Sequence, residues 1–185
     1  MEQRIGGHCF GGQWTIEKLD IFSGYLDFYV TALKNQKFNR LYIDAFAGTG
    51  SITTNEGSQK IEGSIRIALN AKNKFDKYIF IEKKKKYYTE LTNVVNNEYD
   101  EYKDRVEVVN GDCNVELERI CNEIDWRYNR ALMLLDPYAT DVSWDTLKIV
   151  AETKAIDVWY LFPISAVREC CPKKEVQWIH PGRID

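Results

Sequence analysis

Histidine, proline and regularly spaced cysteine are scarce in this sequence of 185 residues. It contains two histidines, four prolines and five cysteines, and none of the cysteines forms a Cys-x-x-Cys pair. His8 and His180 lie near the two ends, so the sequence supports neither a Ser-His-Asp arrangement nor a zinc site. An odd, irregularly spaced set of cysteines favours a reducing compartment over a disulfide framework. We therefore predict no metal site and no disulfides.

Long apolar runs are missing as well. The longest uncharged and mostly apolar stretch, 158–167, has the size of a strand and falls short of the roughly 18 residues of a membrane helix. The first residues lack the hydrophobic region of a signal peptide, so we predict a cytoplasmic protein without a membrane segment. Apolar residues make up 44% and charged residues 29% of the chain, which excludes a disordered protein. We predict a flexible arm over 1–13 and one globular domain over 14–185.

The net charge of −3 hides an uneven distribution. The segment 72–86 has seven lysines against two acidic residues, whereas 90–125 has eleven acidic residues against three basic ones. Such polarity can orient a polyanion over one face of a protein. Solvated helix surface is the more common explanation, and the sequence leaves both open.

Short β-rich runs alternate with helical patterns along the chain. A helix is expected to begin at Thr15 as N-cap and to end at the polar run 34–37. A polar loop is expected up to Gly63, followed by helices over 64–69, around 87–94 and from about 115. Strands are expected over 40–46, 78–81, 106–109, 131–135 and 156–162. This order predicts an α/β fold, a Rossmann-like, doubly wound and mostly parallel sheet of about five strands.

Acidic residues and glycines follow four of the expected strands. In doubly wound sheets, ligands bind outside the carboxyl ends of the strands. Each such residue can instead be a helix cap or a turn former, but four carboxylates at one rim favour a ligand site. The residues are Asp44, Gly48 and Gly50 after the first strand, Glu82 after the second, Asp112 after the third and Asp136 after the fourth.

The spacing of these residues discriminates between cofactors. A dinucleotide site would have a third glycine at position 53, where Thr53 stands, and an acidic residue about 20 residues further on, whereas Glu82 lies 34 residues after Gly48. S-adenosylmethionine fits better. Asp44 can organise the glycine loop and the amino end of the methionine moiety, and Glu82 can accept from both ribose hydroxyls. Asp112 can accept from the adenine amino group, and Cys113 can offer its backbone N–H.

The turn after the fourth strand, Asp136-Pro137-Tyr138, would then face the reacting methyl group. Asp136 and the Pro137 carbonyl are acceptors for a target amino group, and Tyr138 can stack on a planar ring. We therefore predict these three as the catalytic residues, with Lys83, Lys84, Lys85 and Lys86 available to hold the phosphates of a nucleic acid.

Six ordered motifs lie between about Trp14 and Val167. They are Gln13-Trp14-Thr15-Ile16-Glu17-Lys18-Leu19, Leu41-Tyr42-Ile43-Asp44-Ala45-Phe46-Ala47-Gly48-Thr49-Gly50, Phe80-Ile81-Glu82, Gly111-Asp112-Cys113-Asn114, Leu135-Asp136-Pro137-Tyr138 and Ile156-Asp157-Val158-Trp159-Tyr160-Leu161-Phe162-Pro163. Together these motifs resemble the three-Cys-motif partner family, which is similar to class I S-adenosylmethionine-dependent methyltransferases. The resemblance implies a cofactor pocket that includes Phe46 and Lys18, with Lys18 reaching the cofactor carboxylate, and a separate partner protein with a three-cysteine motif.

The resemblance implies methyl transfer to an amino nitrogen, such as that of a nucleic-acid base. Asp136-Pro137-Tyr138 is similar to the Asp-Pro-Pro-Tyr turn of amino-methyltransferases, with one proline missing. The alternative is a non-catalytic module that binds the cofactor or the three-cysteine partner. Only 22 residues follow Pro163, so the C-terminal strands of the methyltransferase sheet are expected to be missing. The fifth strand would then have an open apolar edge through which two copies of the chain can pair.

Overall fold

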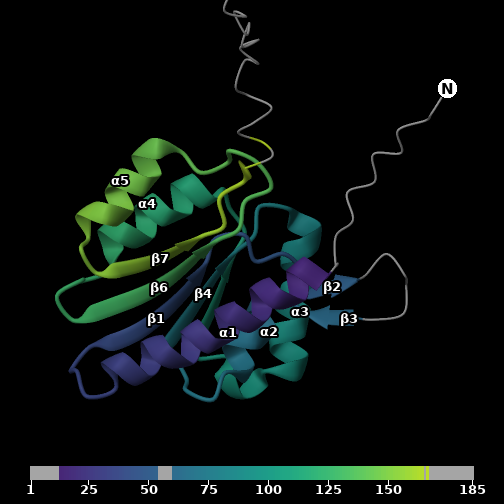
Figure 1. Ribbon diagram of the computed structural model, residues 1–185, viewed down its shortest axis with the longest axis horizontal. Helices are drawn as coiled ribbons and strands as arrows, with labels where there is room; N and C mark the ends of the chain where they lie inside the picture. Colours follow the sequence, from purple (N-terminus) through teal and green to yellow (C-terminus); the bar gives the residue numbers. More distant parts are fainter. Residues whose placement is uncertain (1–12, 54–59, 165, 167–185) are drawn as a thin grey trace, which may run out of the picture.

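Five parallel strands form the centre of the molecule (Figure 1). The computed structural model describes residues 13–53, 60–164 and 166. The order of the strands across the sheet is β5-β4-β1-β6-β7, so the chain builds outward from β1 first on one side and then on the other. This confirms the predicted α/β fold with a doubly wound parallel sheet. The strands are β1 (Asn39–Asp44), β4 (Lys77–Ile81), β5 (Val106–Val109), β6 (Asn129–Leu135) and β7 (Ile156–Tyr160).

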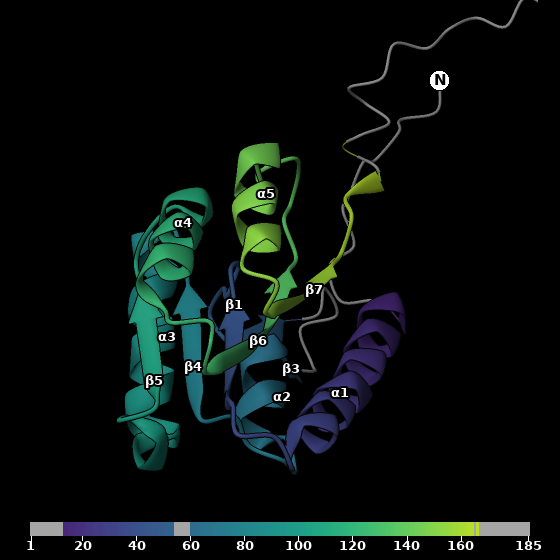
Figure 2. The same ribbon diagram turned by 90° about the vertical axis from the view of Figure 1, so that its left-hand side faces the viewer.

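Helices cover both faces of the sheet (Figures 1 and 2). One face packs against α1 (Gln13–Leu33), α2 (Ser64–Asn70) and α3 (Lys85–Glu98), and the other packs against α4 (Cys113–Glu123) and α5 (Trp144–Glu152). The alternation of side chains along a strand produces these two cores. In β1, Tyr42 faces the first core, and Leu41 and Ile43 face the second. Each such fully buried apolar side chain contributes about 1.5–3 kcal/mol to folding.

Three local features differ from the sequence prediction. The first helix begins at Gln13, two residues before the expected cap at Thr15. The expected polar loop before Gly63 contains an antiparallel hairpin of β2 (Ser51–Thr53) and β3 (Lys60–Glu62). Strands of three residues are too short to show an alternating pattern. The nine-residue helix α5 was not predicted. Ser143 caps it by accepting from the Thr146 N–H.

Strand β7 lies at one edge of the sheet. Its Trp159 packs against α1, with the ring centres of Trp159 and Tyr25 4.9 Å apart. Val158 is 41% exposed, and Phe162, which follows the strand, is 58% exposed. Within residues 13–53, 60–164 and 166, no strand pairs with the outer side of β7. Its pairing with a second copy stays a prediction.

None of the helices in the described segments is long and apolar enough to cross a membrane. The predicted arm over 1–13 lies almost wholly outside the described segments. Cys113 and Cys121 are buried free thiols, and the other three cysteines are also outside those segments.

Candidate functional site

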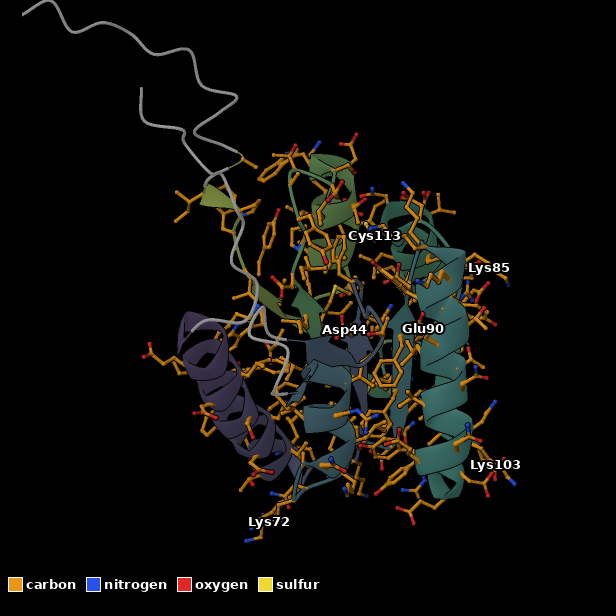
Figure 3. All side chains as sticks on the ribbon, turned by 90° about the vertical axis from the view of Figure 1, so that its right-hand side faces the viewer. Asp44, Lys72, Lys85, Glu90, Lys103 and Cys113 are labelled. Carbon is orange, nitrogen blue, oxygen red and sulfur yellow. The ribbon has the colours of Figure 1, made fainter. Side chains whose placement is uncertain are left out.

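The carboxyl ends of the parallel strands meet at one edge of the sheet, where the predicted site residues are found. Figure 3 labels Asp44 at the end of β1 and Cys113 at the start of α4, both toward this edge of the molecule. Asp44 is the last residue of β1, Glu82 directly follows β4, and Asp136 directly follows β6. Because all these strands run in the same direction, their ends present the three carboxylates to one side.

The glycine loop after β1 contains two glycines in the left-handed region. Gly48 has φ +62° and Gly50 has φ +77°, values that a residue with a side chain adopts at a cost of about 1–2 kcal/mol. A Cβ atom built on Gly48 would meet nothing within 4 Å, so the backbone there borders open space. A Cβ atom on Gly50 would lie 3.6 Å from Leu91 Cδ1. Gly50 thus faces the core, whereas Gly48 is the glycine that leaves room for a ligand.

Asp44 lies beneath this loop and is fully buried. Its carboxylate accepts hydrogen bonds from Ser64 Oγ at 2.6 Å, Tyr42 OH at 3.3 Å and the Phe46 backbone N–H at 3.1 Å. Burial raises the pKa of Asp44 from 3.8 to about 6, although these three hydrogen bonds act to lower it. Asp44 therefore organises the turn from inside and keeps a costly negative charge under the site.

Glu82 connects the glycine loop to the start of α3. Its Oε2 accepts from the Gly48 N–H at 2.9 Å, and its Oε1 accepts from the Lys84 N–H at 2.7 Å. Asn110 holds the same turn by donating to the Glu82 carbonyl at 2.8 Å. Glu82 is only 8% exposed. Each carboxylate oxygen has two lone pairs, so both oxygens keep one for the hydroxyl groups of a ligand.

Asp112 has a structural role that accounts for its position without a ligand. It is the N-cap of α4, where its Oδ1 accepts from the Asn114 N–H at 3.0 Å. Its Oδ2 accepts from Lys83 Nζ at 3.0 Å, and this bond lowers the pKa of Asp112. Cys113 is buried, and burial raises the pKa of its thiol to about 11. As the first residue of α4, Cys113 presents a backbone N–H that has no acceptor within the helix.

The predicted catalytic turn lies at the end of β6, next to α1. Pro137 is buried, whereas Tyr138 is 70% exposed. Lys18 of α1 donates from Nζ to Asp136 Oδ2 at 2.7 Å, across 118 positions of sequence. Among the described residues, none donates to Asp136 Oδ1. Lys18 thus contacts the candidate catalytic carboxylate, and its predicted contact with the cofactor carboxylate stays a prediction.

Sequence reasoning missed residues that hold the site in shape. Ser64 was predicted as a helix start but not as a hydrogen-bond donor to Asp44, and Asn110 was not predicted as a donor to the turn at Glu82. The backbone N–H of Phe46 binds Asp44, while its half-buried ring packs against the α4–α5 face of the sheet. In the described segments, no group of three or more His, Cys, Asp or Glu residues is arranged to hold a metal ion.

A separate hollow of about 330 Å³ lies at the opposite end of the strands, where Asn39 and Lys77 begin β1 and β4. It has two acidic residues: Asp76 accepts three hydrogen bonds from Arg40, at 2.8–3.1 Å, and Asp125 forms an ion pair with Arg127. The polar groups of this hollow are used in the fold, so the carboxyl end of the sheet is the better candidate for a ligand.

Comparisons with known proteins give structural likeness only. No family model and no curated protein matches the chain, so the resemblance to the three-Cys-motif partner family stays a prediction. The solved structures it resembles include protein LPL1258 from Legionella pneumophila, with a TM-score of 0.49, 13% identity and coverage of 74% of this chain and 61% of that one.

Two other solved structures are named as a methyltransferase or contain SAH. A candidate RNA methyltransferase from Pyrococcus horikoshii gives a TM-score of 0.41 and 17% identity, over 80% of this chain and 63% of that one. The N-terminal domain of human METTL16 in complex with SAH gives a TM-score of 0.46 and 12% identity, over 82% of this chain and 60% of that one. The chain spans about six tenths of the length of each of these three structures.

Proposed function

We propose that this chain is an S-adenosylmethionine-dependent methyltransferase that acts on an amino nitrogen. The hydrogen bond between Glu82 and Gly48 is the observation that carries this proposal. It fixes a buried carboxylate beside the one glycine of the loop that borders open space. A carboxylate held at such a place suits the two hydroxyl groups of a ribose, because it can accept from both.

The course of the chain after the glycine loop argues against a dinucleotide. In dinucleotide-binding folds, the loop leads directly into a helix whose N-terminus binds the pyrophosphate. Here the loop leads into strand β2, and α2 begins only at Ser64. The Ser64 hydroxyl is also used to bind Asp44. A nucleoside-like cofactor without phosphates therefore fits these residues better than NAD does.

The residues present fit S-adenosylmethionine, which supplies an electrophilic methyl group when bound. Glu82 would hold the ribose, the Cys113 N–H and Asp112 would contact the adenine, and Asp44 would act from beneath the loop on the amino end of the methionine. Asp136 Oδ1 and the Pro137 carbonyl would accept hydrogen bonds from the target amino group and orient its lone pair. When the nitrogen takes the methyl group, SAH would be released and the proton lost from the nitrogen would pass to solvent.

Isothermal titration calorimetry with S-adenosylhomocysteine (SAH), the cofactor without its methyl group, tests the proposed cofactor pocket. Wild type should bind, and Glu82→Gln should bind at least tenfold more weakly, because a neutral amide cannot accept through both of its polar atoms. Glu90→Gln, on the exposed face of α3, is the matched control and should bind like wild type. Equal binding by wild type and Glu82→Gln would overturn the assignment of the pocket.

Transfer of labelled methyl groups to total RNA, DNA or a protein extract then tests catalysis. Asp136→Asn should lower transfer by at least tenfold while SAH still binds. The alternative is a non-catalytic module that works with a three-cysteine protein, and the ion pair of Asp136 with Lys18 favours it because it occupies one oxygen of the catalytic carboxylate. SAH binding without transfer to any of the three substrate classes would support this alternative.

A further inference from the structure

Four consecutive lysines, Lys83 to Lys86, lie where the end of β4 passes into α3. All four are exposed, and the first turn of α3 contains no acidic residue. The free amide groups at the start of a helix carry partial positive charge, so they add to the field of the lysines. This segment, the lysine turn, is a local anion-attracting surface on a protein whose net charge is −3.

Two lysines of this turn are bound to carboxylates and two are not. Lys83 lies 3.0 Å from Asp112, and Lys86 lies 4.0 Å from Glu90. In the described part of the chain, neither Lys84 nor Lys85 forms an ion pair. Their ammonium groups instead lie over aromatic rings, Lys84 at 5.1 Å from Tyr87 and Lys85 at 4.5 Å from Tyr88. Exposed cation–π contacts are weak, so both ammonium groups are available to an anionic partner.

Tyr138 links the lysine turn to the candidate catalytic turn. The Lys84 ammonium group lies 5.7 Å from the centre of the Tyr138 ring, and Tyr138 follows Asp136 and Pro137 directly. The ring is 70% exposed, so its face is accessible to a nucleic-acid base, which stacks on aromatic side chains. Phe162, 58% exposed, follows the neighbouring strand β7. Flat apolar groups and free positive charges therefore border the same end of the sheet.

The rest of the surface restricts where a polyanion can lie. Helix α4 has three acidic residues, Glu116, Glu118 and Glu123, against one basic residue, Arg119, so its net negative charge would repel phosphates from that side. In Figure 3, Lys85 projects outward from α3, whereas Lys72 lies at the opposite end of the molecule. A chain of phosphates would therefore follow the start of α3 and approach the site from the side of Tyr138.

We infer that the lysine turn and Tyr138 together bind single-stranded nucleic acid, with phosphates on Lys84 and Lys85 and a base stacked on Tyr138. This deepens the proposed function and rests on it, since the stacked base would carry the amino group that is methylated. An acidic peptide would use the lysines but would leave the exposed ring without a role. A base in a duplex would have to be flipped out of the helix to reach the ring.

Fluorescence anisotropy with labelled oligonucleotides tests this inference on the full chain. The probes are a 20-nucleotide RNA, a DNA of the same sequence, the corresponding DNA duplex and poly-glutamate. The test variant is Lys84→Glu/Lys85→Glu. Its control, Lys34→Glu/Lys72→Glu, makes the same change in net charge with exposed lysines near the amino ends of the strands. Tyr138→Ala is matched by Tyr128→Ala, because Tyr128 is 60% exposed and lies next to β6 at its other end.

Wild type should bind both single strands more tightly than the duplex or poly-glutamate. Lys84→Glu/Lys85→Glu should weaken binding at least tenfold and reduce the slope of log affinity against log salt by about 2, since two phosphate contacts are lost. Tyr138→Ala should weaken binding about tenfold at all salt concentrations. Both control variants should bind within twofold of wild type, and the difference between the RNA and DNA arms identifies which nucleic acid is preferred.

Three results would overturn the inference: unchanged binding by the lysine variant, equal loss in the Lys34→Glu/Lys72→Glu control, or tighter binding of poly-glutamate than of the single strands. SAH calorimetry on the same preparations separates this outcome from a failure of the proposed function. SAH binding without oligonucleotide binding refutes only the nucleic-acid surface. Oligonucleotide binding without SAH binding supports the surface and refutes the methyltransferase.

Discussion

The buried carboxylate of Asp44 should lower the stability of the free protein at neutral pH. Its pKa in the folded protein is about 6, against 3.8 in the unfolded chain, so the folded state holds the proton more tightly. Stability from this group is fully present below pH 3.8 and is lost as the pH rises through 6. A pKa difference of about 2 units, at 1.36 kcal/mol per unit, corresponds to about 3 kcal/mol in total.

Asp44→Asn removes this titration and leaves a side chain of the same shape. Between pH 4.5 and pH 7.5, the wild type should lose about 2 kcal/mol of its free energy of unfolding relative to the variant. This change with pH does not depend on any constant offset from altered hydrogen bonds to Ser64 or Tyr42. Urea denaturation of both proteins at several pH values, with equal m-values, measures it directly.

Asp76→Asn is the control because the environment of Asp76 acts in the opposite direction. Burial would raise the pKa of Asp76, but the hydrogen bonds from Arg40 outweigh it and lower the pKa. The contribution of Asp76 is therefore lost only below pH 3.8, and the difference between wild type and Asp76→Asn should be constant from pH 4.5 to 7.5. A constant difference for Asp44→Asn as well would refute the argument that burial raises the pKa of Asp44.

Three further substitutions follow from the geometry. Gly48→Ala should lower the free energy of unfolding by about 1–2 kcal/mol, because φ is +62°, and urea denaturation measures this loss. The same substitution should weaken SAH binding in calorimetry, because the added methyl group enters the open space beside the loop. Lys18→Met should lower the free energy of unfolding by at most about 1 kcal/mol, since the pair with Asp136 is partly exposed; a larger loss in urea denaturation would mean that this pair anchors α1. If copies of the chain pair through the edge of β7, Val158→Lys should convert the dimer to a monomer in light-scattering measurements, and an unchanged mass would exclude that edge.

The sheet was predictable because its strands are unusually apolar. The runs at 78–81 and 131–135 are buried on both faces, so the hydrophobic pattern marks them without ambiguity. The hairpin of β2 and β3 has only three residues on each strand, too few for a period to appear. Helix α5 has two well-buried side chains in nine residues, Thr146 and Val150, and one of them is polar, which conceals the apolar stripe.

For the candidate site, the sequence predicted which residues lie near one another but not their contacts. Their position at strand ends places Asp44, Glu82 and Asp136 at one edge of the sheet, because parallel strands place their ends together whatever the intervening sequence. The pairing of Lys18 with Asp136 depends on how α1 packs against the sheet, and no local pattern encodes that distance. The different roles of Gly48 and Gly50 likewise depend on Leu91, a core residue of α3.

Glu82 connects the two surfaces proposed here, and this connection can be tested. One oxygen accepts from the N–H of Gly48 in the cofactor loop, and the other accepts from the N–H of Lys84 in the lysine turn. A glutamine at this position can accept only through its single carbonyl oxygen, so one of the two amides loses its acceptor, at a cost of about 1–3 kcal/mol. Glu82→Gln should therefore weaken binding of SAH and also of the single-stranded oligonucleotide, although no positive charge is removed. Anisotropy with Glu82→Gln and Glu101→Gln side by side measures this, because Glu101 is exposed and lies in the helix Asp100–Tyr102, beyond the C-terminal end of α3 and outside the lysine turn. Oligonucleotide binding that is unchanged in Glu82→Gln would show that the lysine turn keeps its shape without the carboxylate.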